Sequence, residues 1–249
     1  MKSTKFLILM LAVLLAGYSC QGPDPVLNGD ITVTAQPEED MEGNVWICMA
    51  GTTDSVTINW GDRTPIEKHK LYAAADYWEL FGTYGNIYRY RHKYSNTSKH
   101  TIKITGGVTR LVIESAIIKN LDVSKKTELK DLDCSYNQLK NLNVCKNTEL
   151  TGLYCNHNEL TNLDVSNNTM LCHLRCNNNK LTSLDVSNCV ICLNWIDISS
   201  NQLSAGALNN LFETLNNNLG FKKINIANNP GTSSCDISIA TSKGWEVIR

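Results

Sequence analysis

The sequence predicts a β-rich fold, in which a small β-sandwich is followed by a stack of repeated coils and a helical cap. Three observations support this class. Residues 31–107 carry apolar residues at a period of two, which is typical of strands. Residues 121–183 contain three nearly identical segments at a period of 21 residues, which is typical of stacked repeats. Residues 204–220 change to the spacing of an amphipathic helix.

The first 20 residues have the features of an export signal. Two lysines precede an apolar run from Phe6 to Ala16, and these eleven residues are too few for a membrane span, which needs about 20. The end of the segment resembles the bacterial lipoprotein signal, in which the cysteine becomes the lipidated first residue. This resemblance implies removal of residues 1–19, a lipid on Cys20 and a tether over residues 20–30. It also implies a surface-exposed outer-membrane lipoprotein of the bacterial cell envelope; ordinary secretion is the alternative.

Residues 31–107 are expected to form two packed sheets. The stretch SVTINW, which ends at Trp60, places three apolar residues on one face, and YRYRHKY alternates aromatic with basic residues. No segment here has a convincing helical period, so a small β-sandwich is expected. The strings INWGDRTP and HKYSNTSKHTIKITG resemble the polycystic-kidney-disease (PKD) type of immunoglobulin-like domain, although Arg63 stands where that family has glycine. The resemblance implies an immunoglobulin-like sandwich.

The 21-residue segments share the pattern L-x-x-L-x-C-x-x-N-x-L. Its fixed positions in the three copies are Leu129, Leu150 and Leu171; Leu132, Leu153 and Leu174; Cys134, Cys155 and Cys176; Asn137, Asn158 and Asn179; and Leu139, Leu160 and Leu181. Alternation places the second leucine and the cysteine on one side of a short strand, so stacked coils bury them in a continuous core. The asparagine amide both donates and accepts hydrogen bonds, so we expect it to satisfy backbone groups at the turn after each strand.

A fourth copy, LNWIDISSNQLS, keeps the register with one added residue, isoleucine in place of cysteine, and Asn201. The pattern resembles the leucine-rich repeat, and its units are similar to those of internalins. Together with the signal and the sandwich, the chain resembles the leucine-rich-repeat surface lipoproteins of Bacteroides-type bacteria. This resemblance assigns residues 108–249 to a leucine-rich-repeat solenoid with a cap.

The C-terminal residues are expected to close the open end of the stack. Helical spacing relates four apolar residues, Leu208, Leu211, Phe212 and Leu215. Ser204 is the expected N-cap of this helix, and Gly220 is its expected stop. A second short helix is expected from Asp236, and a last strand from Trp245 to Ile248.

The chain has ten cysteines, which in an exported protein first suggests disulfides. The row Cys134, Cys155 and Cys176 is nevertheless expected to be free and buried, because thiols in register point the same way and serve as small apolar groups. One local disulfide stays open among three cysteines outside this row, Cys172, Cys189 and Cys192. The stretch CVIC has redox-motif spacing but lacks the βαβ context of such a motif.

Composition and motifs favour a non-catalytic protein. The 23 basic and 24 acidic residues nearly cancel, so no electrostatic footprint for nucleic acid is present. No phosphate-binding loop, nucleophile motif or cluster of metal ligands is recognisable, so we expect no enzyme activity, metal or cofactor. Two functions fit: a recognition protein that presents a sheet to a protein or glycan partner, and a structural or adhesion component that packs with other envelope subunits.

The candidate binding residues are found among the positions that flank the buried residues of each strand. In successive coils these positions are Asp131, Gly152, His173 and Trp195; Asp133, Tyr154, Arg175 and Asp197; and Ser135, Asn156, Asn177 and Ser199. A diagonal across three coils therefore contains Tyr154, His173, Arg175 and Trp195, and tryptophan, tyrosine and arginine are the residue types enriched at binding hot spots. The alternative is that aromatic residues are simply favoured in exposed strands, with Trp195 packed under the next coil.

Overall fold

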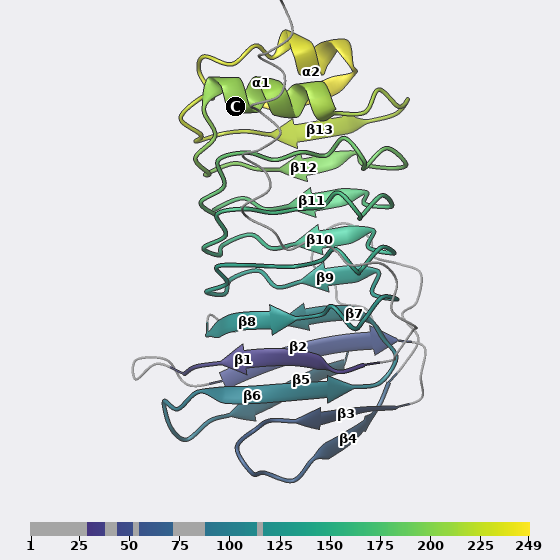
Figure 1. The fold of residues 1–249 in the computed structure, drawn as a ribbon, viewed down its shortest axis with the longest axis vertical. Helices are drawn as coiled ribbons and strands as arrows, with labels where there is room; N and C mark the ends of the chain where they lie inside the picture. The colour runs from purple at the N-terminus through teal and green to yellow at the C-terminus, as the bar shows by residue number, and fades with distance from the viewer. Residues whose placement is uncertain (1–28, 38–43, 52–54, 72–87, 114–116) are drawn as a thin grey trace, which may run out of the picture.

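The computed structural model describes residues 29–37, 44–51, 55–71, 88–113 and 117–249. The expected β-rich class is confirmed, because these residues form two sheets and two short helices (Figure 1). The smaller sheet has the order β4 (Glu67–Lys70), β3 (Ser55–Asn59), β6 (His100–Thr105), β1 (Ile31–Ala35) and β8 (Ile118–Asp122). The larger sheet has the order β14 (Trp245–Ile248), β13 (Lys222–Asn225), β12 (Trp195–Asp197), β11 (His173–Arg175), β10 (Gly152–Tyr154), β9 (Asp131–Asp133), β7 (Val108–Ile113), β2 (Asn44–Gly51) and β5 (Tyr88–Lys93).

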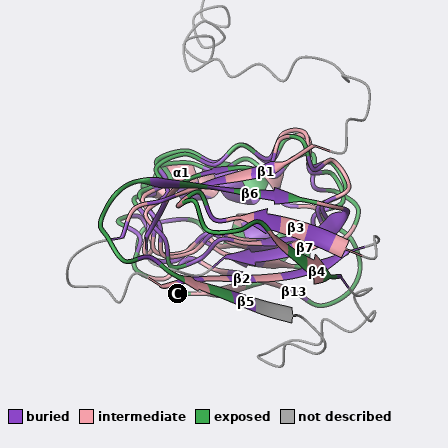
Figure 2. Ribbon diagram, turned by 90° about the horizontal axis from the view of Figure 1, so that it is seen from below, coloured by how far each residue is buried: buried purple, intermediate pink, exposed green. Residues whose placement is uncertain are grey.

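The N-terminal part packs two layers of antiparallel strands around an apolar core. Buried and half-buried residues alternate along β1, β2 and β3, as expected for strands with one face in a core (Figure 2). Trp60 lies in this core, and its carbonyl accepts a hydrogen bond of 2.6 Å from the hydroxyl of Tyr94. The ring of His92 stacks on Trp60 and forms a 2.6 Å contact with Asp62. The aromatic residues thus tie β3 and β5 together across the core.

The larger sheet continues from the N-terminal part into the repeats without a break. Strand β7 pairs antiparallel with β2 on one side and parallel with β9 on the other, with Leu111 beside Leu132. Strand β8 in turn pairs with β1 in the smaller sheet. Strand pairing therefore crosses the expected boundary between residues 107 and 108, and β7 and β8 serve both parts.

The repeats stack as coils with one strand each. Strands β9 to β13 are parallel and in register, so Leu132, Leu153, Leu174, Ile196 and Ile224 lie side by side. All five are buried, together with the leucines that precede and follow strands β9 to β12 in the repeat pattern. Neighbouring strands in such a sheet lie about 4.8 Å apart, so the coils share one continuous apolar core.

A ladder of asparagine side chains joins each coil to the next at the end of the strand. The Nδ2 of Asn158 donates to the carbonyls of Cys134 (2.9 Å) and Cys155 (3.1 Å), while its Oδ1 accepts from the amide of Leu139 (2.9 Å). Asn179 and Asn201 repeat these contacts. In the first rung Asn137 donates to the carbonyl of Ile113, which ends β7. The ladder therefore begins on the strand shared with the N-terminal part.

The residue before each ladder asparagine has a left-handed backbone. These residues are Tyr136, His157, Asn178, Ser200 and Asn228, with φ between 53° and 59°. The turn directs each following asparagine inward, where its amide reaches the carbonyls of two coils. The rings of Tyr136 and His157 stack at 4.3 Å on the outside of this turn.

A second ladder, which the repeat pattern did not predict, lies on the opposite side of the coils. Asn147 donates to the carbonyls of Val123 and Lys126, at 2.9 and 2.7 Å, and Asn168 makes the same contacts one coil later. Cys189 takes the next position. The first position is Lys126, whose buried ammonium donates to the carbonyl of Gly106 between β6 and β7. Burial lowers the pKa of Lys126. Its hydrogen bond to Gly106 links the first repeat to the N-terminal part.

Helix α1 (Ala205–Thr214) covers the last coils and begins where expected. The hydroxyl of Ser204 accepts from the amide of Ala207, and Leu208, Leu211 and Phe212 are buried. The expected stop at Gly220 is wrong, because the helix ends at Thr214. The side chain of Asn216 there donates to the carbonyl of Leu193 (2.8 Å) and accepts from the amide of Asn218, which holds the chain against the preceding coil.

The second C-terminal helix, α2 (Ser238–Ser242), begins two residues later than expected. The carboxylate of Asp236 lies before it and accepts from the amide and hydroxyl of Ser238. Strand β14 has the expected bounds and completes the larger sheet beside β13.

Candidate functional site

The candidate residues lie together on the outer face of strands β10, β11 and β12. In-register pairing places Tyr154 beside Arg175, and His173 beside Trp195. Because side chains alternate along a strand, all four project on the side opposite to the buried leucines. The geometry therefore brings the four predicted side chains onto one continuous surface across three coils.

Arg175 lies between two aromatic rings. Its guanidinium carbon is 5.8 Å from the ring centre of Tyr154 on one neighbouring coil and 5.9 Å from that of Trp195 on the other. Both distances are within the range of cation–π attraction. The half-buried His173 has its pKa lowered by burial and by the nearby Arg175, which favours the neutral imidazole. The arrangement leaves His173 as a neutral hydrogen-bonding group beside the guanidinium.

The row continues by one more coil than the sequence indicated. Lys223 on β13 lies with its ammonium 5.9 Å from the ring of Trp195 and 5.3 Å from that of Phe221. The same ammonium forms an ion pair of 3.0 Å with Glu246 on β14. Tyr154, Arg175, Trp195, Lys223 and Phe221 thus form an alternating row of rings and cations, which we call the aromatic–cationic row.

A glycine makes room for the first ring of the row. A side-chain carbon at Gly152 would lie 2.6 Å from a carboxylate oxygen of Asp131 and 3.0 Å from the ring of Tyr154. Asp131 is itself paired with Arg110 on β7 at 3.0 Å. Burial and the Asp131 charge raise the pKa of Tyr154 to about 12, so its hydroxyl stays protonated as a hydrogen-bond donor at neutral pH.

The expectation that all flanking positions face solvent needs correction. Asp131, Gly152, Ser135 and Ser199 are buried. Asp131 is covered through its pairing with Arg110, whereas each serine hydroxyl turns back to the aspartate two residues earlier, Asp133 or Asp197. The partly accessible side chains of the face therefore run from Tyr154 on β10 to Lys223 on β13.

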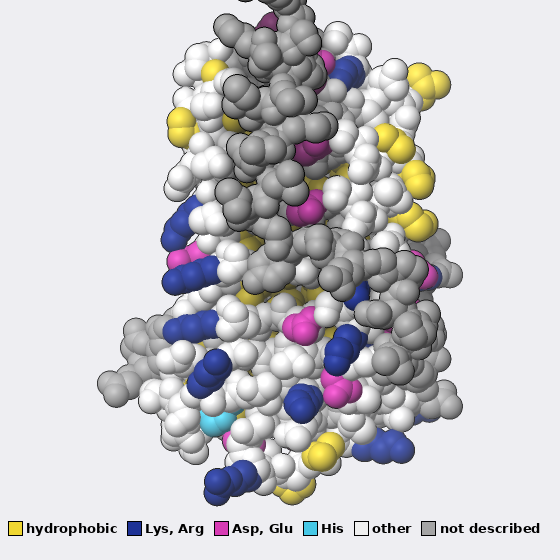
Figure 3. Space-filling view, in the orientation of Figure 1, with side chains coloured by type: hydrophobic (Ala, Val, Ile, Leu, Met, Phe, Trp, Pro, Cys, Tyr) yellow, Lys and Arg dark blue, Asp and Glu magenta, His cyan; other side chains and the backbone are white. Residues whose placement is uncertain are grey.

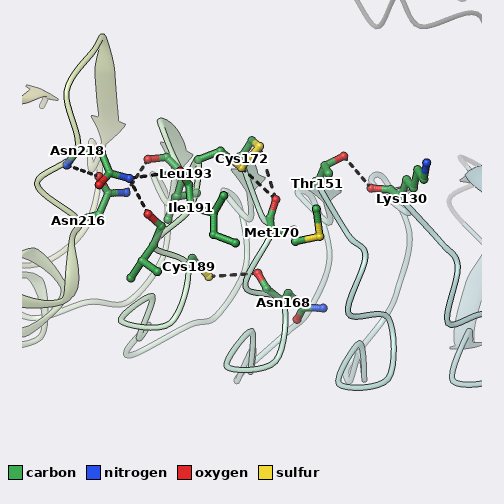
Figure 4. Close-up of a disulfide and its surroundings, with 12 residues drawn as sticks. Lys130, Thr151, Asn168, Met170, Cys172, Cys189, Ile191, Leu193, Asn216 and Asn218 are labelled. Atoms are coloured by element: carbon green, nitrogen blue, oxygen red, sulfur yellow. Dashed lines mark hydrogen bonds between the residues drawn. A yellow bond between two sulfur atoms is a disulfide. The ribbon is translucent and has the colours of Figure 1, made fainter.

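Whether these cysteines are free or form a disulfide follows from their positions in the coil. The thiols of Cys134, Cys155 and Cys176 are free and fully buried, and burial raises the pKa of each. Cys172 and Cys192 form a disulfide between adjacent coils, with Cα atoms 4.7 Å apart (Figure 4). Cys189, the third residue left open by the sequence, is a free buried thiol in the second ladder.

Other sites have little support in the described residues. Within them, no group of three histidine, cysteine or acidic side chains is placed to hold a metal ion. The part of the chain that the structure describes contains no helix with the length and apolar character needed to cross a bilayer. The proposed lipidation site, Cys20, and most of the proposed tether lie outside the described residues.

Comparisons with known proteins give similarity to solved structures alone. No protein-family model matches the chain, and no curated protein matches it. The functional domain of InlJ from Listeria monocytogenes, described as including a cysteine ladder, matches with 29% identity and a TM-score of 0.44. Internalin InlF from the same species matches with 16% identity and a TM-score of 0.40.

The similar structures are internalins, which are leucine-rich-repeat proteins. The InlJ match covers 53% of this chain and 27% of the InlJ structure. The InlF match covers 56% of this chain and 46% of the InlF structure. The chain therefore spans less than half of either solved structure.

Proposed function

We propose that the chain is a non-catalytic recognition protein that binds a protein partner through the outer face of β10 to β13. The observation that carries this proposal is the aromatic–cationic row. It places three residue types enriched at binding hot spots, tyrosine, arginine and tryptophan, side by side on one rigid surface.

The chemistry of the row suits recognition. Arg175 is held between Tyr154 and Trp195, so it loses little side-chain freedom on binding. The indole Nε1 of Trp195 is buried and has no hydrogen-bond partner within the described residues. This donor lies beside the row and is available to an accepting group of a partner.

The architecture around the row completes the proposal. We propose that residues 31–107 are a PKD-like sandwich, that residues 108–249 are a leucine-rich-repeat solenoid with a cap, and that Cys20 carries a lipid. The proposed location is the outer membrane of a bacterial cell envelope, with the row directed outward. Alternating burial in β1 to β3 and the in-register coils support the two folded parts.

Substitutions in the row test this function. Tyr154→Ala, Arg175→Ala and Trp195→Ala should each weaken binding at least tenfold, about 1.4 kcal/mol, because each removes part of the same contact surface. The partner is first captured from bacterial and host extracts on immobilised wild-type protein. Its affinity for each variant is then measured. Melting temperatures check folding; Arg175→Ala is the most informative variant, because Tyr154 also packs over Gly152.

A matched control separates the row from the rest of the surface. Lys140 is exposed at the turn after the first asparagine ladder, away from the row, so Lys140→Ala should leave binding unchanged. Binding that survives all three row substitutions would move the site elsewhere and contradict the proposal. Selective binding on a glycan array, abolished by Trp195→Ala, would retain the site but change the class of partner to a glycan.

A further inference from the structure

A second surface, separate in character from the row, runs along the side of the coils that precedes the strands. Five large apolar side chains are exposed there, and we call them the apolar flank: Met170 (43% exposed), Val190 (52%), Ile191 (61%), Leu219 (102%) and Phe221 (69%). In Figure 3 hydrophobic side chains gather in a column on the upper right of the molecule, beside the starts of β11 to β13. Single exposed apolar residues are ordinary, but a contiguous group is not.

The flank arises from a change of residue type at one position of the repeat. That position is Glu128 and Glu149 in the first two coils, but Met170 and Ile191 in the next two. The apolar column therefore begins at the third coil and has an exposed carboxylate, Glu149, at its lower edge. An apolar centre with a charged edge is the usual composition of a protein–protein interface.

The flank is held in place before any partner binds. The disulfide between Cys172 and Cys192 joins the two coils that carry Met170 and Ile191 (Figure 4). The side chain of Asn218 donates to the carbonyls of Val190 and Ile191, at 2.6 and 3.4 Å, which fixes the loop bearing Leu219 against them. A surface ordered in this way loses little conformational freedom on association.

The exposed area suits contact with a surface of the same size. Aromatic side chains present on the order of 150–250 Å² and aliphatic ones less, so the five exposed fractions, which together equal about three side chains, leave on the order of 500 Å² exposed. Two flanks facing each other would thus bury about 1,000 Å² in total, the least area that a specific interface needs.

We propose that the apolar flank binds the same flank of a second copy of this chain, in a two-fold symmetric dimer. The five side chains carry no charge, so a copy needs no complementary ions to pack on them, and two-fold symmetry brings apolar groups onto apolar groups. With the axis near Ile191, Met170 of one copy faces the loop of Leu219 in the other, and the two stacks run in opposite directions. The aromatic–cationic row meets the flank at Phe221, which the dimer would cover, whereas Tyr154, Arg175 and Trp195 lie outside the flank.

Sedimentation equilibrium of the purified full chain, in density-matched detergent, tests the proposal. The wild type should have twice the mass of its own single chain, and Ile191→Asp with Leu219→Asp should give the mass of one chain at the same micromolar concentrations. The expected increase in dissociation constant is at least tenfold. The circular dichroism spectrum of the double variant should match that of the wild type, because both side chains are exposed and the fold of the single chain does not depend on them.

Ile66→Asp is the matched control, because Ile66 is as exposed as Ile191 but lies in the N-terminal part, far from the flank. This variant should remain a dimer. A wild type that stays monomeric would overturn the proposal, as would a dimer that persists in the flank double variant. A monomeric wild type that binds lipid vesicles, together with a flank double variant that does not, would identify a lipid surface as the occupant. That result would also overturn the proposal.

Discussion

Replacing Asn158 with alanine should lower the free energy of unfolding by roughly 1–3 kcal/mol. The substitution removes the donor to the carbonyls of Cys134 and Cys155 and the acceptor for the amide of Leu139. The carbonyls of Cys134 and Cys155 each keep a second donor, Asn137 or Asn179, so the buried group left without a partner is the amide of Leu139, and the cost is that of one unpaired polar group.

Denaturant unfolding of two further variants makes the measurement specific. Lys125 is exposed on the outside of a coil, so Lys125→Ala should change stability by no more than about 0.5 kcal/mol. Asn158→Asp keeps the acceptor and the shape but loses the donor, and should also be destabilised. Equal denaturation midpoints for Asn158→Ala and Lys125→Ala would contradict the prediction, because they would show that the ladder does not stabilise the fold.

Alkaline pH should destabilise the protein through the buried row Cys134, Cys155 and Cys176. An unfolded thiol has a pKa near 9.0, whereas burial raises the pKa of each folded thiol above that value. The unfolded chain therefore releases protons that the folded chain retains, so stability is complete below pH 9 and falls as the pH rises. From about pH 8 to about pH 10 the expected loss in the free energy of unfolding is about 1.4 kcal/mol for each thiol and about 4 kcal/mol for the three thiols together.

The variant Cys155→Val isolates this effect from other groups that titrate at high pH. It replaces one thiol by an apolar side chain of similar size, so its loss of stability over the same interval should be smaller by about 1.4 kcal/mol. A pH dependence identical to that of the wild type would contradict the prediction. A thiol reagent gives a second measurement, since the thiols of Cys134, Cys155 and Cys176 should react after denaturation and not before.

The repeat could be predicted because every coil faces the same physical requirement. Each coil must bury one strand face and satisfy the same turn, so leucine, cysteine and asparagine recur at fixed positions, and their places follow from alignment. The second ladder has the same cause but uses Lys126, Asn147, Asn168 and Cys189, and this mixture of residue types hides its period.

The missed parts of the site lie where the period breaks. Tyr154, Arg175 and Trp195 occupy repeat positions, so they could be placed on one face from the sequence. Lys223 and Phe221 follow helix α1, which lengthens the last coil and removes the register that would have aligned them with the row. The disulfide was ambiguous for a related reason, since one added residue places Cys192 before Leu193, although Cys172 follows Leu171.

The junction between the two parts could not be read from the sequence at all. Alternation in β7 indicates which residues are buried, but it does not say which strands lie on either side. The pairing of β7 with both β2 and β9 depends on contacts between residues distant in the sequence. The buried Lys126 is a further consequence of that junction, because its partner is the carbonyl of Gly106.

The central claim, that the face of β10 to β13 recognises a partner, is tested most directly by photo-crosslinking. A benzoylphenylalanine residue in place of His173 lies within the candidate face, and the same residue in place of Lys140 lies at a turn outside it. After irradiation in extract, position 173 should yield a discrete protein adduct that position 140 does not, and adding Arg175→Ala should reduce that adduct at least tenfold. Adducts of equal yield at both positions, or an adduct unaffected by Arg175→Ala, would contradict the claim.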